Sequence, residues 1–175
     1  GYLDFDEPFL KMRHQGMILG PDGKKMSKSK GNVISPDDVI EKFGADTLRI
    51  YEMFMGPIDA DKPWDARAVI GIYKFLRRIY DLAEQSIADG SQSSSSSLTK
   101  KLHQTIQKVT SDVPKLKFNT AIASLMELVN LWEKDKQIAV SDLEKLVLIL
   151  APFAPFMTED IYWQIQGNED ESIHK

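Results

Sequence analysis

Apolar side chains recur at helical spacing along most of the chain after about residue 65. In the stretch 66–87 an apolar side chain returns every three or four residues, which places the set on one face of a long helix. The same spacing predicts further helices over 98–113, 118–132, 141–150 and 161–165. We interpret these apolar faces as core, because helices that pack side by side must bury stripes of this kind.

Capping residues indicate where some of the helices begin and end. Ser35 and Pro36 are typical of a helix start, and Gly44 is typical of a helix end. Together they predict a short helix. Further along, Ser141 and Glu144 form a capping-box pattern, which predicts that another helix begins there.

Between the helices, the segment ADGSQSSSSS at 88–97 is polar and of low complexity. It offers nothing to bury, so we expect a mobile connection. Residues 1–19 are expected to be extended or irregular, with a short hairpin arm or strand in MRHQGMIL. A loop over 20–34 and a helical stretch over 35–55 follow. The predicted fold is mainly α, with a small mixed region over 1–62 and an antiparallel helical bundle over 63–175.

Composition and charge narrow the choice of function only a little. The 175 residues include 22 Lys and Arg against 26 Asp and Glu, a net charge of −4, so a nucleic-acid surface must be a local patch. The absence of cysteine excludes a disulfide framework and a thiolate metal site. No apolar run approaches the length of a membrane span, and no signal peptide is visible. The chain begins GYLDFDEPFL without an initiator methionine, so we interpret it as an excised fragment.

One stretch departs from that average charge. GPDGKKMSKSKGNV, at 20–33, combines four lysines, two serines and three glycines. Ammonium groups and hydroxyls bind anions, glycine lets the backbone approach a ligand closely, and the helix start that follows adds the positive end of a dipole. These residues suit a polyanion, and a phosphate chain is the natural candidate.

On composition alone, three interpretations other than a phosphate-binding loop have to be considered for this stretch. One is a solvated basic loop without a ligand. Another is a nuclear-localisation patch, although Met and Ser interrupt the charge run. A Walker-type phosphate loop does not fit, because the Gly-Lys pair lacks a glycine five positions earlier and a Ser or Thr directly after the lysine.

The order of the residues resembles a known signature. KMSKS at 25–29, followed shortly by Gly-Asn, resembles the signature loop of class I aminoacyl-tRNA synthetases. GADTLRIYEMFMGP at 44–57 is similar to the segment that follows this loop in leucyl-tRNA synthetases. FNTAIASLMELVN at 118–130 and LAPFAPFMTEDIYWQI at 150–165 are similar to helices of the anticodon-binding bundle of that family.

The resemblance implies a C-terminal fragment of a bacterial-type leucyl-tRNA synthetase, with a stem-contact region that carries the KMSKS loop before an anticodon-binding bundle. The whole enzyme would be a cytoplasmic monomer that attaches leucine to tRNA(Leu) through leucyl-adenylate. ATP would be a substrate, Mg²⁺ would accompany ATP, and neither a membrane nor a metal bound by the fragment is implied. The fragment is expected to be inactive alone. The His-Ile-Gly-His signature of the family lies upstream, and HQGM at 14–17 does not match it.

The resemblance also implies roles within the motif. Lys28 and Lys25 are the expected catalytic residues, and Lys28 would meet the ATP phosphates as charge moves onto the leaving pyrophosphate. Ser27 and Ser29 would stabilise the closed loop, and Met26 would anchor it by packing. All five are therefore predicted to bind ATP. Without ATP the loop is expected to be mobile and to have few partners.

Three basic residues of the helix over 66–87 are candidates for contact with tRNA. Lys74 and Arg78 lie four residues apart on one face, with Arg77 beside them. In a family that binds tRNA, these side chains would meet phosphates. The alternative is a solvated helix face that is balanced by acidic residues such as Asp81.

Three other functions stay open. Another large class I synthetase, for valine, isoleucine or methionine, is the nearest of them. A non-catalytic RNA-binding helical module and a purely structural bundle are the others. Both leave the residue order of the lysine-rich loop unexplained, so that order favours a synthetase.

Overall fold

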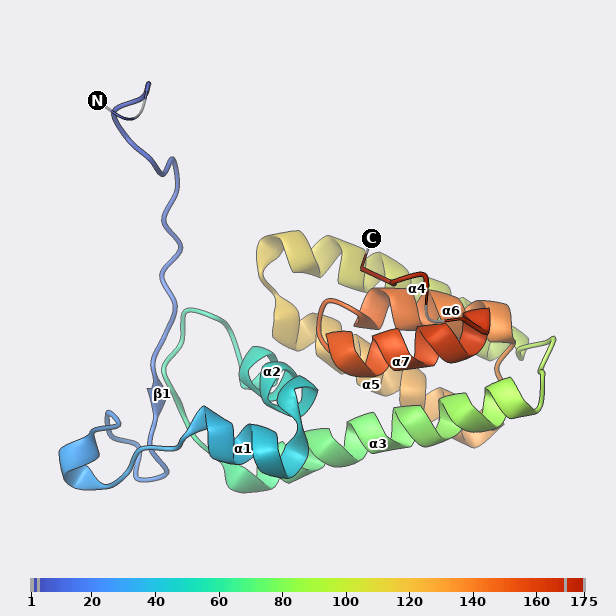
Figure 1. Ribbon diagram of the computed structural model, residues 1–175, viewed down its shortest axis with the longest axis horizontal. Coiled ribbons are helices and arrows are strands. Elements are labelled where there is room, and N and C mark those ends of the chain that lie inside the picture. The colour runs from blue at the N-terminus through green and yellow to red at the C-terminus, as the bar shows by residue number, and fades with distance from the viewer. Residues whose placement is uncertain (1, 3, 169, 175) are drawn as a thin grey trace.

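The computed structural model describes residues 2, 4–168 and 170–174, and these residues are mainly helical, as predicted (Figure 1). The helices are α1 (Pro36–Phe43), α2 (Ala45–Phe54), α3 (Ala66–Ala88), α4 (Ser96–Asp112), α5 (Phe118–Asp135), α6 (Val140–Leu150) and α7 (Pro155–Gln166). The other described elements are the strands β1 (Ile18–Leu19) and β2 (Lys62–Pro63) and the 3-10 turns η1 (Lys28–Lys30) and η2 (Val113–Lys115). Within the described residues, no helix combines the length and the apolar character needed to span a bilayer.

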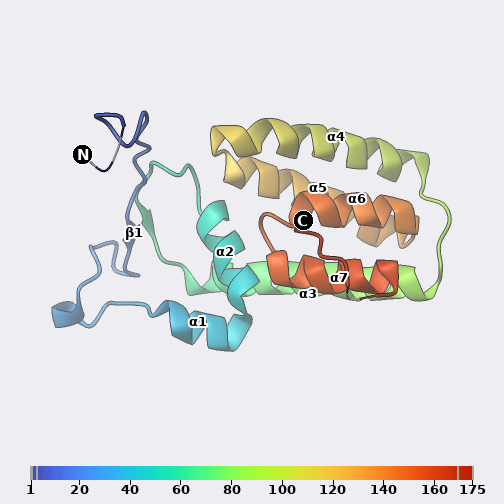
Figure 2. The same ribbon diagram turned by 45° about the horizontal axis from the view of Figure 1, so that its top comes forward.

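The apolar stripes of α3 to α7 form the core, which confirms their interpretation. Figures 1 and 2 show these helices side by side, with α3 along one edge of the group. Leu102 of α4, Leu125 and Trp132 of α5 and Leu143 of α6 are fully buried. A leucine side chain contributes roughly 1.5–3 kcal/mol when it is buried in this way. The antiparallel order of the bundle stays a prediction.

Helix α2 attaches the N-terminal region to the other helices. It contacts α3, α5 and α7, and its residues Ile50 and Tyr51 are buried in the same core. The guanidinium of Arg49 donates a hydrogen bond of 2.9 Å to the carbonyl of Pro152, just before α7. The apolar core is therefore continuous from the N-terminal region into the bundle. The predicted division at residue 62 stays a prediction.

A pair of short strands fixes where the lysine-rich loop begins. β1 pairs in parallel with β2, Ile18 with Lys62 and Leu19 with Pro63. Leu19 also forms an isolated antiparallel bridge with Lys25, on the far side of a turn. The strand expected in MRHQGMIL is thus present.

Helix α1 has the predicted bounds but not the expected cap. Ser35 occupies the N-cap position and Pro36 the first helical position, yet the Ser35 hydroxyl makes no capping hydrogen bond. Gly44 ends the helix with φ +84°, a backbone conformation that favours glycine. Because Gly44 also precedes α2, it forms the corner between the two helices.

The serine run at 88–97 has more partners than its composition suggested. Ser91 is buried, and Ser95 caps α4 by accepting a hydrogen bond of 3.1 Å from the N–H of Leu98. The Ser94 hydroxyl donates to the carboxylate of Asp142 at 2.8 Å. The expectation of a connection with nothing to bury is therefore wrong, because short hydroxyls in this segment satisfy polar groups at the start of α6.

The prediction of a capping box at Ser141 is also wrong, because residues of the serine run supply the hydrogen bonds at the start of α6. Helix α6 begins at Val140, and its N-cap is Ala139, whose side chain cannot accept a hydrogen bond. Instead, the Ser94 hydroxyl accepts from the N–H of Ala139 at 2.9 Å, and the carbonyl of Ser91 accepts from the N–H of Val140 at 3.0 Å. A distant segment therefore supplies the partners that a local cap normally provides.

Candidate functional site

The lysine-rich loop, residues 20–34, connects β1 to α1 (Figure 1). Its first part is a tight turn, in which the N–H of Gly23 donates to the carbonyl of Gly20 at 2.9 Å. The N–H of Gly20 donates in turn to the carbonyl of Lys24 at 2.8 Å. Gly23 has φ +70°, which L side chains rarely adopt, so this turn depends on glycine.

The second part of the loop carries the KMSKS sequence. Ser27 has an extended backbone, the turn η1 follows, and Gly31 ends the turn with φ +65°. The hydroxyl oxygens of Ser27 and Ser29 lie 2.8 Å apart and share a hydrogen bond. The two serines thus contact each other within the motif.

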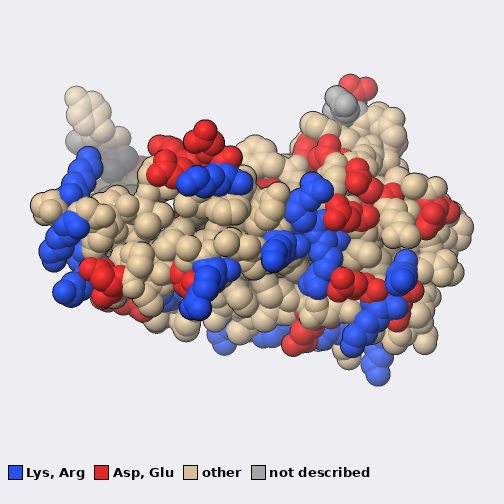
Figure 3. All heavy atoms as spheres, turned by 90° about the horizontal axis from the view of Figure 1, so that it is seen from below, with Lys and Arg blue, Asp and Glu red and all other residues tan. Residues whose placement is uncertain are grey.

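The four lysine side chains of the loop are exposed: Lys24, Lys25, Lys28 and Lys30. In the described part of the chain, none of them forms an ion pair with a carboxylate. Lysine and arginine side chains gather at the left end of the face drawn in Figure 3, the end at which the loop lies in Figure 1. The loop therefore presents positive charge to solvent, and its ammonium groups are free of ion pairs among the described residues.

Met26 differs from the exposed lysines of the loop. It is half-buried and lines a cavity of about 180 Å³ together with Ile18, Ile34, Leu48 and Trp64. An apolar side chain in this position packs the loop against β1 and α2. The structure thus places Met26 in an apolar seat at the base of the loop.

The candidate tRNA residues lie together on α3. Lys74, Arg77 and Arg78 line one shallow groove of about 360 Å³. The guanidinium of Arg78 donates at 2.9 Å to the Glu133 carboxylate and also to a side-chain oxygen of α5, and Arg77 forms an exposed ion pair with Asp81. Lys74 is exposed and has no ion pair among the described residues. Two of the three charges are therefore partly compensated within the fold.

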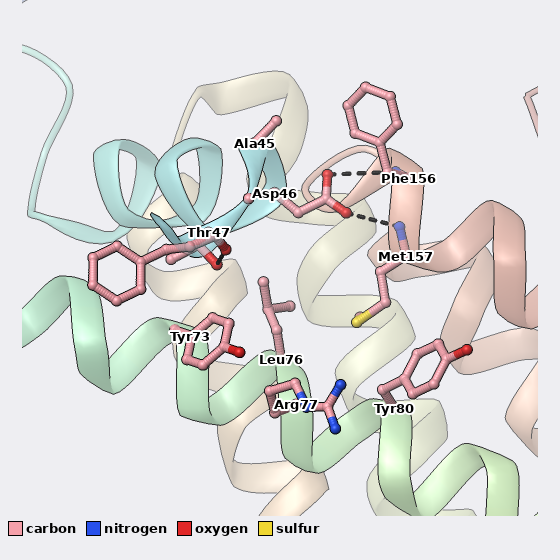
Figure 4. A pocket seen from close by; sticks show the side chains of 11 residues that line it. Ala45, Asp46, Thr47, Tyr73, Leu76, Arg77, Tyr80, Phe156 and Met157 are labelled. Carbon is pink, nitrogen blue, oxygen red and sulfur yellow. Dashed lines mark hydrogen bonds between the residues drawn. The ribbon is translucent and has the colours of Figure 1, made fainter. Parts of the chain in front are cut away.

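A larger pocket of about 500 Å³ lies between α2, α3 and α7 (Figure 4). Tyr73, Arg77 and Tyr80 line it from α3, and Met157 lines it from α7. At its edge, the Asp46 carboxylate accepts a hydrogen bond of 2.8 Å from the N–H of Met157. Burial raises the pKa of Asp46, and the hydrogen bonds from the start of α7 oppose that shift.

Two family models match the chain on either side of α3. Residues 2–65 match the model described as tRNA synthetases class I (I, L, M and V). Residues 96–175 match the anticodon-binding domain of tRNA ligase. The chain belongs to the class I tRNA synthetases.

The relatives of this synthetase chain are leucine–tRNA ligases. The chain is 46% identical over 170 residues to the enzyme of Bdellovibrio bacteriovorus, which covers 95% of this chain and 21% of that protein. It is 43% identical over 169 residues to the enzyme of Sorangium cellulosum, which covers 97% of this chain and 19% of that protein. The chain thus spans about a fifth of the length of these relatives.

A solved synthetase structure has the same fold. The crystal structure of the ternary complex of Agrobacterium radiobacter K84 agnB2 LeuRS, tRNA and LeuAMS matches with a TM-score of 0.84 and 31% identity. The match covers 99% of this chain and 24% of that one. The arrangement of the loop region and the helices is therefore that of a tRNA synthetase.

The donors in the KMSKS loop of this synthetase chain suit a phosphate rather than a metal ion. The loop offers lysine ammonium groups and serine hydroxyls, whereas Mg²⁺ prefers carboxylate and other oxygen ligands. In the described residues, no group of three or more His, Asp or Glu side chains is placed to hold a metal. Phosphate oxygens are the ligands that these side chains fit.

The sequence-based interpretation of this synthetase chain missed the partners of Asn32. The Asn32 side chain accepts a hydrogen bond of 2.9 Å from the N–H of Ser27 and donates one of 3.2 Å to the Asp22 carboxylate. The expectation of few partners for the loop is therefore wrong, although these partners all lie within the loop. The only signal in the sequence was the short distance along the chain between an aspartate, the motif and an asparagine.

Proposed function

We propose that the chain is part of a leucine–tRNA ligase, which activates leucine with ATP and transfers it to tRNA(Leu). The relatives that support this proposal are leucine–tRNA ligases at 42–46% identity over 95–99% of the chain. The structural observation that carries it is the exposed KMSKS loop, in which lysines without ion pairs stand beside serine hydroxyls. Such a loop is suited to meet the phosphates of ATP.

Lys28 is the proposed catalytic residue of this chain. When the carboxylate of leucine attacks the α-phosphate of ATP, the bond to pyrophosphate breaks and negative charge accumulates on the leaving group. An ammonium group that meets this charge more closely in the transition state than in the ground state accelerates the step. Lys28 begins the turn η1 and its side chain is free of ion pairs among the described residues, so it can reach a phosphate without first breaking a contact.

The rest of the motif supports Lys28. Lys25 supplies a second ammonium group to the phosphates, and Ser27 and Ser29 stabilise the turn between the two lysines. Met26 anchors the loop through its apolar seat. Mg²⁺ accompanies the phosphates of ATP, and no residue of this chain is assigned to it.

The helical part of the chain binds tRNA in this proposal. Lys74, Arg77 and Arg78 are the candidate contacts, because they share one groove on α3. Support comes from the anticodon-binding family match over 96–175. The complete enzyme is proposed to act as a cytoplasmic monomer.

Amino-acid specificity is the part of the proposal that most needs a test. The matched synthetase model includes the isoleucine, leucine, methionine and valine enzymes. Pyrophosphate exchange by the complete enzyme should therefore be measured with each of these four amino acids. Leucine should support the fastest exchange, and faster exchange with any of the other three would contradict the proposal.

The isolated 175-residue chain should not catalyse this exchange. Binding both substrates in reacting geometry can contribute roughly 7–11 kcal/mol to a reaction, and this chain spans only about a fifth of its relatives. Leucine-dependent exchange above background by the isolated chain would show that it holds the substrates by itself.

A further inference from the structure

The side chain of Asn32 links three parts of the lysine-rich loop. Its carbonyl oxygen accepts a hydrogen bond of 2.9 Å from the N–H of Ser27. Its amide nitrogen donates to the Asp22 carboxylate, at 3.2 Å and 3.4 Å to the two oxygens, and to the carbonyl of Lys25 at 3.4 Å. One amide group therefore contacts the backbone on both sides of Met26 and the turn at the start of the loop.

Asp22 is itself held in place by the turn. Its carboxylate accepts a hydrogen bond of 3.1 Å from the N–H of Lys24. This backbone hydrogen bond and the one from the Asn32 amide hold the pKa of Asp22 below its usual range. Asp22 is therefore ionised at neutral pH and acts only as an acceptor.

A side chain at position 20 would require the side chains of Asp22 and Asn32 to shift. A Cβ atom on Gly20 would lie 2.8 Å from a carboxylate oxygen of Asp22 and 2.9 Å from the amide nitrogen of Asn32. Both distances are shorter than ordinary van der Waals contacts. Asn32 and Asp22 thus meet at a place where the backbone comes unusually close to them.

We propose that Asn32 and Asp22 form a polar brace that positions the KMSKS loop for its contact with phosphate. The proposal rests on the proposed function of the loop. The brace joins residues ten positions apart, so it closes the segment between them into a ring. Lys25 and Lys28 lie within that ring, and their ammonium groups are carried by a backbone that the brace holds in one shape. Asn32 and Asp22 are positioning residues, because they act through the lysines rather than on the substrate.

Only an amide satisfies all the partners at position 32. The N–H of Ser27 needs an acceptor, whereas the Asp22 carboxylate and the carbonyl of Lys25 need a donor. A carboxylate at this position would keep the first contact, lose the other two and repel Asp22. Exchanging the two side chains would restore a donor and an acceptor across the same gap.

This reciprocity gives a direct test in the complete enzyme. Leucine-dependent pyrophosphate exchange should be measured for Asn32→Asp, for Asp22→Asn and for the double variant. Asn32→Asp should lower kcat about tenfold, which is the effect of losing a hydrogen bond to a charged group, and should change the KM for ATP much less. The double variant should recover to within about threefold of the wild type. Wild-type kcat in Asn32→Asp, or a double variant as slow as the product of the two single effects, would overturn the brace.

Amide hydrogen exchange tests the brace independently of catalysis. In the same complete enzyme, Asn32→Ala should speed exchange in the peptide that contains the N–H of Ser27, because that N–H loses its acceptor. Lys30→Ala is the matched control, since the exposed Lys30 side chain forms no ion pair within the described part of the chain, and it should leave the exchange unchanged. Unchanged exchange in Asn32→Ala would overturn the brace. A wild-type enzyme without leucine-dependent activity would instead refute the proposed function and leave this second test intact.

Discussion

Asp142, at the start of α6, collects hydrogen bonds from three segments. Its carboxylate accepts from the Ser94 hydroxyl at 2.8 Å, from the Thr99 hydroxyl at 3.3 Å and from the Lys145 ammonium at 2.8 Å. Burial raises the pKa of Asp142, but the contacts from Lys145 and Ser94 outweigh it, so the pKa lies below its usual range. A single carboxylate thereby ties the serine run, α4 and α6 together.

The lowered pKa of Asp142 predicts how stability depends on pH. The folded protein holds the charged form more strongly than the unfolded chain does, so this contribution is present above the unfolded pKa of about 3.8 and is lost as pH falls through the folded pKa. Asp142→Asn should therefore lower the free energy of unfolding by about 1–3 kcal/mol at neutral pH and by less in acid. Urea unfolding of the chain at about pH 7 and about pH 3 measures the difference.

Asp81→Asn is the control for this experiment. Asp81 forms an exposed ion pair with Arg77, so its replacement should change stability by less than about 1 kcal/mol. An equal loss of stability in Asp142→Asn at both pH values would show that hydrogen-bond geometry, and not the charge of Asp142, stabilises the start of α6.

Two of the polar contacts that sequence analysis missed join residues far apart in the chain. Ser94 and Asp142 lie 48 positions apart, and Asp46 and Met157 lie 111 positions apart. Apolar spacing reports which face of a helix is buried, so it predicted the helices and their core faces. It carries no information about which polar side chain reaches which helix end across the fold. Asn32 was missed although it is local, because its hydrogen bonds follow from the path of a loop and not from a repeat.

At the scale of the element, α3 combines a buried stripe with the basic groove. Its residues Ile72 and Ile79 are buried in the core, whereas Lys74 and Arg77 are exposed. Arg78 differs from both of these basic residues, because it is half-buried and contacts α5 through Glu133. The three candidate tRNA residues are therefore not equivalent.

This difference predicts separate effects on tRNA binding. Lys74→Gln in the complete enzyme should reduce the slope of log affinity for tRNA(Leu) against log salt by about one, because one phosphate contact is lost. Arg78→Gln should instead lower the melting temperature and change the slope less, because the Arg78 guanidinium already donates hydrogen bonds to side chains of α5. Binding titrations at several salt concentrations measure the slope. A slope unchanged by Lys74→Gln would remove Lys74 from the proposed tRNA contacts.

The packing of α5 gives a prediction about the core. Leu128 is fully buried, so Leu128→Ala should cost about 2–5 kcal/mol of stability through lost contacts and a residual cavity. Leu148 on α6 is 48% exposed, and Leu148→Ala should change stability by less than about 0.5 kcal/mol. Urea unfolding of the two variants of the chain compares them. Similar losses in both would contradict the assignment of the core faces.

At the scale of the whole molecule, the fold separates the loop from the helices that support it. The core runs without interruption from Val39 in α1 to Ile161 in α7. The KMSKS residues lie outside that core, whereas Ile34, at the end of the lysine-rich loop, packs against it, and Met26 lines a cavity beside Ile34 and Leu48. In the proposed function, the lysine side chains would reach the phosphates from a loop whose backbone the brace holds in place.

The central claim is that Lys28 acts on the transition state of leucine activation. It is tested most directly by steady-state pyrophosphate exchange with Lys28→Ala in the complete enzyme, with Lys30→Ala as the control. Removing one preorganised donor typically costs about 3 kcal/mol, so kcat should fall on the order of a hundredfold while the KM for ATP changes little. Lys30→Ala should have a far smaller effect. If Lys28→Ala raises only the KM for ATP and leaves kcat unchanged, Lys28 binds ATP equally in both states and the claim is wrong.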